Sequence, residues 1–398
     1  MNIRIIKNVT EYTDCFIKNG YMVQVRDEES DYGDIKAKKY FLYDLSRNES
    51  IEIEPSIPKY NLINVKDIKS DSDYVYFTSI KKGNEDEKHL ITLYRYSIST
   101  KECSIAYSFE EKLEKYQDYM RTTIFAINEY YLIVQNEFLR ANLTEEYVDY
   151  FDFELYLYSI SEDKKYKITD ERFIRYGISY FESISSNMCV IKLGYDLLKD
   201  NRYNILKKNE AAKESISFVN IGQMVSDILI GQQEVVINTI ENVYYTATIP
   251  YIKLIGEYII YSKVKLEENF DEEIIFYNYA TKETIMCINS SSGEDKEPIL
   301  TCVIDNEPYV IRTGVKGYEF INVKQKETVL YINHTDKIEN TMNNIIVVSG
   351  QDKGFFGKIK PYVMVYKAPT AKVLHKEKGS YVASFFSKDE QLYIVTNS

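Results

Sequence analysis

The sequence is poor in the residues that build most catalytic and metal centres. Its 398 residues include no tryptophan, three histidines, five cysteines and fifteen glycines. No two cysteines have the spacing of a zinc site. The glycine-rich patterns that cradle phosphate groups, Gly-x-Gly-x-x-Gly and Walker A, do not occur. We therefore expect no metal ion and no cofactor.

Basic residues are outnumbered by acidic ones, with 49 lysines and arginines against 61 aspartates and glutamates. The formal net charge is −12 and the isoelectric point is about 5.1, and no basic face is evident. A protein that binds phosphate groups needs such a face, so nucleic acid and anionic membrane are poor partners. No run of about 18 apolar residues occurs, which argues against a membrane-spanning helix.

The N-terminal residues lack the apolar stretch of a secretory signal, so we expect a cytoplasmic protein. The cysteines fit this expectation, because they are odd in number, widely spaced and set among apolar residues. We interpret them as buried free thiols in a reducing compartment. They are Cys15, Cys103, Cys189, Cys287 and Cys302.

Tyrosine is abundant, with 38 copies beside 18 phenylalanines, and it recurs in a pattern. An apolar or aromatic pair is followed by Tyr-x-Ile/Leu-Ser, a charged turn and a second apolar stretch. β-Branched and aromatic side chains suit the half-buried surface of a sheet. The clearest copies are residues 40–46, 93–99, 155–161 and 275–280. The repetition predicts an all-β array of similar units.

Each unit is interpreted as two hairpins. The best signal of a first hairpin is Asn19-Gly20 between two apolar stretches. Seven equivalent turns follow, at residues 70–73, 128–129, 186–187, 256–257, 306–307, 343–344 and 388–390. The Tyr-rich pattern makes the second hairpin and occurs seven times, counting a degenerate copy at 234–248.

Four strands per unit are typical of β-propeller blades. Residues 41–47 (FLYDLSR) and 155–163 (LYLYSISED) resemble the blade motif of bacterial propellers of the TolB and prolyl-oligopeptidase N-terminal type. The resemblance implies a fold and no functional residue. We expect one domain over residues 1–398 with eight blades, or seven if one hairpin is misread. Pairing of the N-terminal strand with the C-terminal hairpin would close the ring; a tandem β-sandwich or an open solenoid is the alternative.

Two segments break the strand pattern. Residues 108–111 form a capping box before Leu113, Tyr116 and Met120, which predicts a short helix. Residues 196–231 read as a largely helical insertion, in which apolar residues recur at helical spacing and Gly231 stands where a helix would end. That helix is expected to pack on the sheets, or alternatively to dock a partner.

The sequence shows no catalytic constellation. A hydrolase of the prolyl-oligopeptidase type needs a Gly-x-Ser-x-Gly elbow, which does not occur. The histidines His89, His334 and His375 are distant in sequence and read as surface residues. The acidic clusters 27–34 and 267–273 read as solvated loops, although the first has oxygen ligands that suit calcium.

Aromatic residues among acids are the best candidates for a binding surface. Tyr147, Tyr150 and Phe151 lie between two expected strands, and aromatic anchors in a polar rim are typical of protein interfaces. In the insertion, Phe218 and Val225 are candidates because they lie at helical spacing on the expected amphipathic helix, which could dock a partner.

The sequence favours a non-catalytic protein-interaction or scaffold propeller with an unidentified protein partner. The alternative is a propeller enzyme that acts on glycans, with carboxylates from different blades at the central channel. A structural component of a larger assembly is a third hypothesis. Whether the protein is an enzyme stays open, with a binding role favoured.

Overall fold

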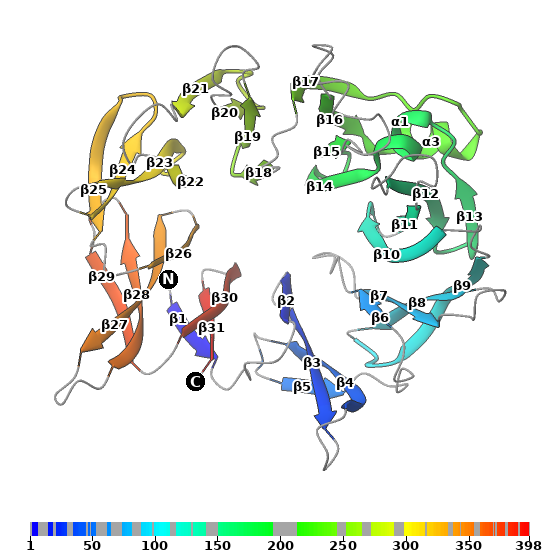
Figure 1. Ribbon diagram of the computed structural model, residues 1–398, viewed down its shortest axis with the longest axis horizontal. Helices are drawn as coiled ribbons and strands as arrows, with labels where there is room; N and C mark the ends of the chain where they lie inside the picture. The colour runs from blue at the N-terminus through cyan, green and yellow to red at the C-terminus, as the bar shows by residue number, and fades with distance from the viewer. Residues whose placement is uncertain are drawn as a thin grey trace. The chain divides into compact units, whose positions relative to one another are not determined.

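The structure of the protein is a computed structural model (Figure 1). It describes residues 2–6, 15–18, 21–29, 35–44, 47, 49–52, 62–64, 74–81, 89–97, 99–111, 117–128, 130–140, 150–193, 213–244, 252–264, 272–289, 298–314, 317–332, 337–342, 344–353, 359–368, 370, 372–378, 381–388 and 391–397. The chain divides into two compact units, one of Met1–Glu11 with Val243–Ser398 and the other of Tyr12–Asn242.

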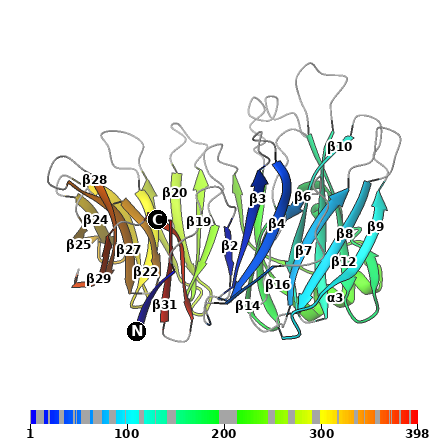
Figure 2. The same ribbon diagram turned by 90° about the horizontal axis from the view of Figure 1, so that it is seen from below.

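The unit Tyr12–Asn242 holds four sheets of four antiparallel strands each, as far as the described residues go. In Figure 2 the strands of β6–β9 lie side by side. The sheets are β2 (Cys15–Lys18), β3 (Tyr21–Glu29), β4 (Ile35–Asp44) and β5 (Glu49–Glu52); β6 (Leu62–Asn64), β7 (Tyr74–Lys81), β8 (His89–Ser97) and β9 (Cys103–Glu111); β10 (Gln117–Ala126), β11 (Tyr131–Arg140), β12 (Tyr150–Ser159) and β13 (Lys164–Lys167); and β14 (Ile178–Ser185), β15 (Met188–Leu193), β16 (Lys213–Asn220) and β17 (Asn238–Tyr244).

The other unit repeats this plan. Its described residues form three four-stranded sheets and one three-stranded sheet. They are β18 (Ile252–Ile255), β19 (Tyr258–Val264), β20 (Glu272–Asn278) and β21 (Thr284–Asn289); β22 (Pro298–Ile304), β23 (Glu307–Gly314), β24 (Gly317–Asn322) and β25 (Glu327–Ile332); β26 (Lys337–Met342), β27 (Ile345–Lys353), β28 (Ile359–Lys367) and β29 (Lys372–Lys378); and β1 (Asn2–Ile6) with β30 (Tyr381–Lys388) and β31 (Gln391–Asn397).

The all-β architecture of four-stranded antiparallel sheets is therefore confirmed. The eight expected first hairpins are all strand pairs; β2 and β3, for example, place Lys18 opposite Tyr21 across the predicted Asn19-Gly20 turn. The β1 strand pairs in parallel with β31, with Asn2 opposite Gln391. The number of blades, ring closure and the single domain remain predictions.

Three outermost strands carry a β-bulge at a similar place. One residue of β9, β25 and β29 has no partner in the register, and these residues are Ala106, Val329 and Leu374. A bulge twists an edge strand away from other chains, which limits edge-to-edge aggregation. The first bulge also serves packing, because the Tyr158 hydroxyl of the next sheet donates a hydrogen bond to the Ala106 carbonyl oxygen at 2.6 Å.

Four tips of the second hairpins share one backbone conformation. Each begins with serine or asparagine, and the residue four positions later has a positive φ. In the tip after β20, the Asn278 Oδ1 atom accepts hydrogen bonds from the N–H groups of Ala280 and Thr281, both at 2.9 Å. Lys282 then adopts φ 60°, which strains any side chain. The four left-handed residues are Lys101, Asp163, Lys282 and Lys326.

Replacement of Lys282 by glycine should therefore stabilise the protein. Relief of the left-handed strain exceeds the extra chain entropy of glycine, and we expect a gain of about 0.5 kcal/mol in the free energy of unfolding. The matched control is Ala280→Gly in the same tip, where φ is not positive and a loss of about 0.5–1 kcal/mol is expected. Urea unfolding of both variants measures this, and equal losses in the two would contradict the strain argument.

The predicted helix of the 196–231 insertion is confirmed in its last part. Helix α3 spans Ile221–Leu229; Asn220 caps its N-terminus, and Gly231 follows it in the left-handed conformation at φ 73°. The residues directly before it, Lys213–Asn220, form strand β16, so the helical interpretation is wrong for that segment, and residues 196–212 lie outside the described residues. Phe218 lies opposite Val190 of β15, so it belongs to the strand β16 and not to the helix.

The helix predicted from the capping box at 108–111 is wrong. These residues end strand β9, where Phe109 pairs with Ile91 and Glu111 with His89. Met120 lies in strand β10, and Leu113 and Tyr116 fall outside the described residues. The continuous ladder with β8 satisfies the backbone groups that a helix would otherwise satisfy.

A second helix, α1 (Glu171–Tyr176), was not expected from the sequence. Its N-terminal cap is Asp170, whose carboxylate is only 1% exposed. Arg172 donates hydrogen bonds to this carboxylate from its backbone N–H at 2.9 Å and from its guanidinium, with Nη2 2.5 Å from Oδ2. The Val235 N–H donates to Oδ2 at 2.8 Å.

Residues 230–237, here called the strap, connect α3 to β17 and are held by two buried carboxylates. The Val235 N–H bonds Asp170, and the next N–H, of Val236, bonds Oδ2 of Asp227 in α3 at 3.0 Å. Arg172 adds a hydrogen bond from Nη2 to the Val235 carbonyl oxygen at 2.7 Å. The strap thereby fastens the two helices to each other.

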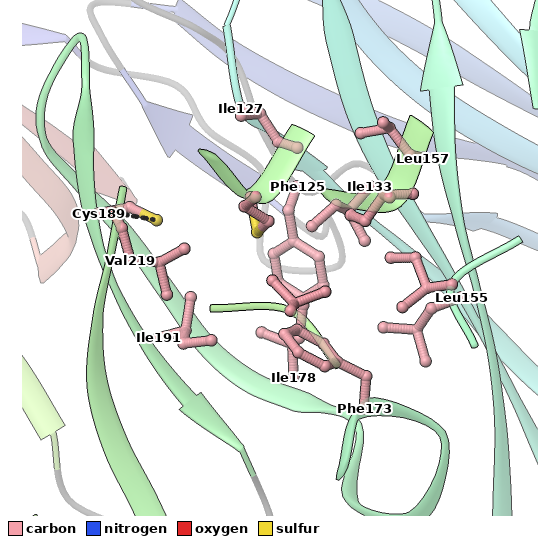
Figure 3. Close-up of a cluster of buried hydrophobic side chains, with 14 of the residues drawn as sticks. Phe125, Ile127, Ile133, Leu155, Leu157, Phe173, Ile178, Cys189, Ile191 and Val219 are labelled. Atoms are coloured by element: carbon pink, nitrogen blue, oxygen red, sulfur yellow. Dashed lines mark hydrogen bonds between the residues drawn. The ribbon is translucent and has the colours of Figure 1, made fainter. Parts of the chain in front are cut away.

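Both helices cover a hydrophobic cluster between the sheets β10–β13 and β14–β17 (Figure 3). Phe173 of α1 packs there with Leu155, Leu157 and Ile191, all less than 2% exposed. Cys189 lies in the same cluster as a free thiol, and burial raises its pKa to about 12. Cys302 is also free and buried, so the cysteine prediction is confirmed for these two residues. In the described part of the chain, neither helix is long and apolar enough to cross a membrane.

Candidate functional site

The structure describes only some of the binding residues predicted from the sequence. Tyr147 lies outside the described residues, and Tyr150 and Phe151 begin strand β12, where their side chains are not described. Phe218 is a half-buried residue of β16. Val225 is 8% exposed in α3 and packs in the cluster beneath that helix. The binding role of these five residues stays a prediction.

A different feature repeats through the sheets. The pattern lies in the second strand of five sheets, which begins at the turn of the first hairpin. Counted from that turn, three buried apolar residues are followed directly by a polar one. The stretches are residues 132–135, 189–192, 259–262, 309–312 and 346–349, which end in Gln135, Lys192, Ser262, Arg312 and Ser349. In these five strands the buried apolar run near the hairpin turn thus ends at a polar residue, and the part of the sheet from that residue onward is here called its polar end.

In the sheet β10–β13, the polar end is built from three consecutive residues of β11. Gln135, Asn136 and Glu137 are all buried, at 8% exposure or less. Gln135 bridges to the next sheet, because its Oε1 accepts from the Ile178 N–H at 2.6 Å and its Nε2 donates to the Ile178 carbonyl at 3.3 Å. Burial of three polar side chains in a row is costly unless each is bonded, so this end is ordered by hydrogen bonds.

In the other unit, two neighbouring sheets share such a polar end. Arg312 on β23 lies directly opposite Glu319 on β24, and both are half-buried. An added Cβ at Gly314 would meet the Glu319 side chain, so this carboxylate lies close over the strand. Lys253 on β18 is half-buried as well, and desolvation lowers its pKa although the nearby Cys302 thiol acts in the opposite direction.

The opposite end of these sheets carries an ionic cluster at the surface. Lys324 Nζ lies 3.7 Å from Glu307 and 3.8 Å from Glu283, which belongs to the neighbouring sheet. Burial lowers the pKa of Lys324. The opposing effects outweigh burial and raise the pKa: Tyr258 acts through its charge and a hydrogen bond, and Glu307 and Glu283 act through their charges. This cluster links tips of adjacent sheets, and exposed ion pairs of this kind add little stability.

The sequence reasoning missed the polar ends because it searched for local motifs. A signal was present: each apolar run in a second strand stops abruptly at a polar residue. Lys253 and Arg312 lie 59 positions apart and belong to two different sheets, so no local motif links them.

Comparison with known proteins yields structural likeness only. No protein-family model matches the sequence, and no curated protein matches it. Solved structures do match, with β-propellers among them. The resemblance to propeller blades is thereby confirmed at the level of the fold.

One match is Porphyromonas gingivalis dipeptidyl peptidase 4, with a TM-score of 0.52 and 10% identity, over 90% of this chain and 51% of that one. The propeller domain of the trilobed protease from Pyrococcus furiosus matches with a TM-score of 0.41 and 8% identity, over 96% of this chain and 98% of that one. Pyrococcus horikoshii acylaminoacyl peptidase gives 0.44 and 8%, over 96% and 57%. The chain spans about half the length of the dipeptidyl peptidase.

The comparison contradicts the expected non-catalytic scaffold and its glycan-acting alternative. The match with a TM-score above 0.5 is a dipeptidyl peptidase by its description, which names no glycan. The sequence interpretation relied on the missing catalytic motif, but this chain matches only 51% of the dipeptidyl peptidase chain, so a motif in the remainder of that enzyme would have no counterpart here. At such low identity the likeness itself shows only the fold.

Proposed function

We propose that this chain is the propeller component of a peptidase-type system. In this role it receives extended peptides and presents them to a hydrolytic domain. The observation that carries the proposal is the match to dipeptidyl peptidase 4, which extends over 90% of this chain. Since the sequence has no Gly-x-Ser-x-Gly elbow, the proposal assigns bond cleavage to a separate catalytic domain, which is the protein partner.

The proposal includes a complete propeller. Seven four-stranded sheets and the sheet of β1, β30 and β31 would make eight blades, and the β1–β31 pairing would close the ring as a single domain. Such a ring arranges its sheets around a central channel and places the same end of every sheet on the same face of the ring.

The polar ends suit a peptide ligand. An extended peptide offers N–H and C=O groups at regular spacing, and a peptide in a dry site needs partners for each of them. Hydroxyl and guanidinium groups at the polar ends of the sheets β18–β21, β22–β25 and β26–β29 include both donors and acceptors; Ser262, Arg312 and Ser349 are examples.

Two measurements test the proposal. In the first, fluorescence anisotropy with unstructured, labelled hexapeptides should give a Kd of about 10–100 μM, and an oligosaccharide panel should not compete. In the second, dipeptidyl p-nitroanilide hydrolysis should co-elute with the tagged chain purified from its own cells. Absence of peptide binding up to about 1 mM, or displacement of the peptide by a glycan, would contradict the proposal.

A further inference from the structure

One edge of the sheet β26–β29 has a charge opposite to that of the whole protein. Residues 352–378 contain seven lysines and two acids, a formal charge of +5 in a chain whose net charge is −12. Strand β29 is the outermost strand of this sheet and β28 is its neighbour; Figure 1 shows the two in shades of orange. The exposed lysines of these strands are Lys360, Lys367, Lys372, Lys376 and Lys378.

Four of these lysines lack a counter-charge within the protein. Lys376 has one, because its Nζ atom lies 3.2 Å from Oδ2 of Asp352 and 3.8 Å from the centre of the Tyr362 ring. Glu377, the acid of these two strands, is half-buried and lies 3.7 Å from His375. In the part of the chain that the structure describes, no hydrogen bond or ion pair engages the side chains of the other four lysines. These four, here called the basic edge, are Lys360, Lys367, Lys372 and Lys378.

The basic edge carries an electrostatic cost in the free protein. Lys367 lies directly opposite Lys372 on the adjacent strand, and like charges in such a pair repel each other. Lys378 lies opposite Tyr362, and Lys360 is two residues from Tyr362 on the same strand, so both lysines point to the same face of the sheet. Carboxylates bound between these ammonium groups would reduce the repulsion, so the edge is complementary to an anionic ligand.

Aliphatic side chains are exposed along the same edge. Val373 and Leu374 directly follow Lys372 and are 48% and 38% exposed, and Ile359, next to Lys360, is 58% exposed. These three are the large apolar residues that β28 and β29 expose, and none is an aromatic residue on which a nucleic acid base could stack. Lysines beside aliphatic groups suit a ligand that carries both carboxylates and aliphatic side chains, which describes an acidic protein segment.

The range of charge interactions also favours a protein segment over nucleic acid or an anionic membrane. At physiological salt, charges more than about 8 Å apart are largely screened. A segment that lies along β29 therefore meets mainly the lysines. An extended polyanion also approaches the acids that give the rest of the chain its negative charge.

We propose that the basic edge is a docking surface for an acidic segment of a protein partner. The segment lies along β29, with its carboxylates between the lysines and its aliphatic side chains against Val373 and Leu374. Because β29 has seven residues, about seven or eight extended residues cover it. The β-bulge at Leu374 interrupts edge pairing, so the segment is held by side chains rather than by a continuous backbone ladder. This inference goes beyond the proposed function, because it needs no peptide at the polar ends.

A labelled octapeptide of four glutamates, two leucines and two serines tests the inference by fluorescence anisotropy. An unlabelled neutral hexapeptide at about 1 mM is present throughout, so that sites for neutral peptides are occupied. The acidic peptide should bind with a Kd of about 10–100 μM at about 50 mM salt and about tenfold more weakly at about 250 mM. The same peptide with glutamine for glutamate should bind at least about tenfold more weakly, and equal binding of the two would overturn the inference.

Variants locate the binding. The triple variant Lys360→Gln, Lys372→Gln and Lys378→Gln should weaken the acidic peptide at least about tenfold. The matched control removes three exposed lysines from tips and edges of other sheets and should change the Kd less than about twofold. Its substitutions are Lys164→Gln, Lys282→Gln and Lys326→Gln. Equal losses in the two triple variants would show that only net charge matters, and no docking surface would then be assigned.

A single variant separates docking from stability. Lys372→Glu places an acid opposite Lys367, so the variant should unfold at a higher urea concentration than the native protein. The same change should weaken the acidic peptide at least about tenfold. Undiminished binding of the acidic peptide to this more stable variant would overturn the inference.

The alternative ligands are compared directly. Single-stranded DNA of about 20 nucleotides and vesicles with about 30% phosphatidylserine should bind no more tightly to the native protein than to the Lys360, Lys372 and Lys378 triple variant. If either loses affinity in that variant while the acidic peptide fails to bind, the edge serves a different ligand and the inference is wrong. Neutral hexapeptides should bind the triple variant as they bind the native protein, so their failure would contradict the proposed function alone.

Discussion

Replacement of Asp170 by alanine is expected to lower the free energy of unfolding by about 3–5 kcal/mol. The carboxylate is 1% exposed and accepts hydrogen bonds from the Arg172 backbone and guanidinium and from the Val235 N–H. Alanine leaves the Val235 N–H buried without its acceptor and the guanidinium without its counter-charge. It also removes the N-terminal cap of α1, and the expected change in the free energy of unfolding includes this loss. Urea unfolding at neutral pH measures the effect.

Two controls identify the buried carboxylate as the cause. Glu171→Ala removes an exposed acid from the same turn and should cost less than about 1 kcal/mol. Asp170→Asn retains a carbonyl oxygen for Val235, so its loss should be smaller than that of Asp170→Ala. If Asp170→Ala costs no more than Glu171→Ala, the strap is not fastened through this residue.

The pH dependence of Asp170 provides a further check. Burial raises its pKa, but the hydrogen bonds from Arg172 and Val235 outweigh burial, and the pKa falls below the usual 3.8. Because the folded-state pKa is lowered, the stabilisation is fully present above the unfolded-state pKa and is lost as the pH falls through the folded-state value. The stability difference between the native protein and Asp170→Asn should be constant from pH 7 to about pH 5 and should shrink below about pH 3.8.

The fold was largely predictable because its signals are local and repeated. Turn dipeptides and the Tyr-rich pattern mark pairs of strands that lie close in sequence. The structure contains these pairs as neighbouring antiparallel strands. Helix α1 escaped notice since six residues carry too little periodicity. Its stability depends on Val235, which is 63 positions from Arg172, and no local pattern records that partner.

The candidate site was not predictable in the same way. The capping box at 108–111 shows how a short motif fails when a neighbouring strand, here β8, satisfies the same backbone groups. The cations Lys253 and Arg312 come from different sheets, so the sequence offers only the end of an apolar run as a hint. The sequence favoured binding residues by their type and spacing, which do not reveal burial. One of these residues, Val225, packs in the hydrophobic cluster under α3.

The second large effect is expected at the other end of α1. Gly177 follows that helix at φ 63°, in the left-handed region. A Cβ atom there would lie 2.8 Å from the ring of Phe153, which packs against the hydrophobic cluster under the helix. Gly177→Ala should therefore lose about 2–3 kcal/mol, from backbone strain of about 1 kcal/mol and from displacement of a packed ring. Thermal and urea unfolding measure the loss.

Gly231 is the control, because it follows the other helix with a positive φ of 73° and has no atom within 4 Å of the added Cβ. Gly231→Ala should cost only the strain, about 1 kcal/mol, partly offset by the lower entropy of the unfolded chain. The difference between the two variants then isolates the clash with the ring. Phe153→Leu combined with Gly177→Ala should recover part of that difference, since the double variant removes the ring edge that Cβ meets. Equal losses for Gly177→Ala and Gly231→Ala would show that Phe153 moves aside without cost and that the cluster does not hold its ring in place.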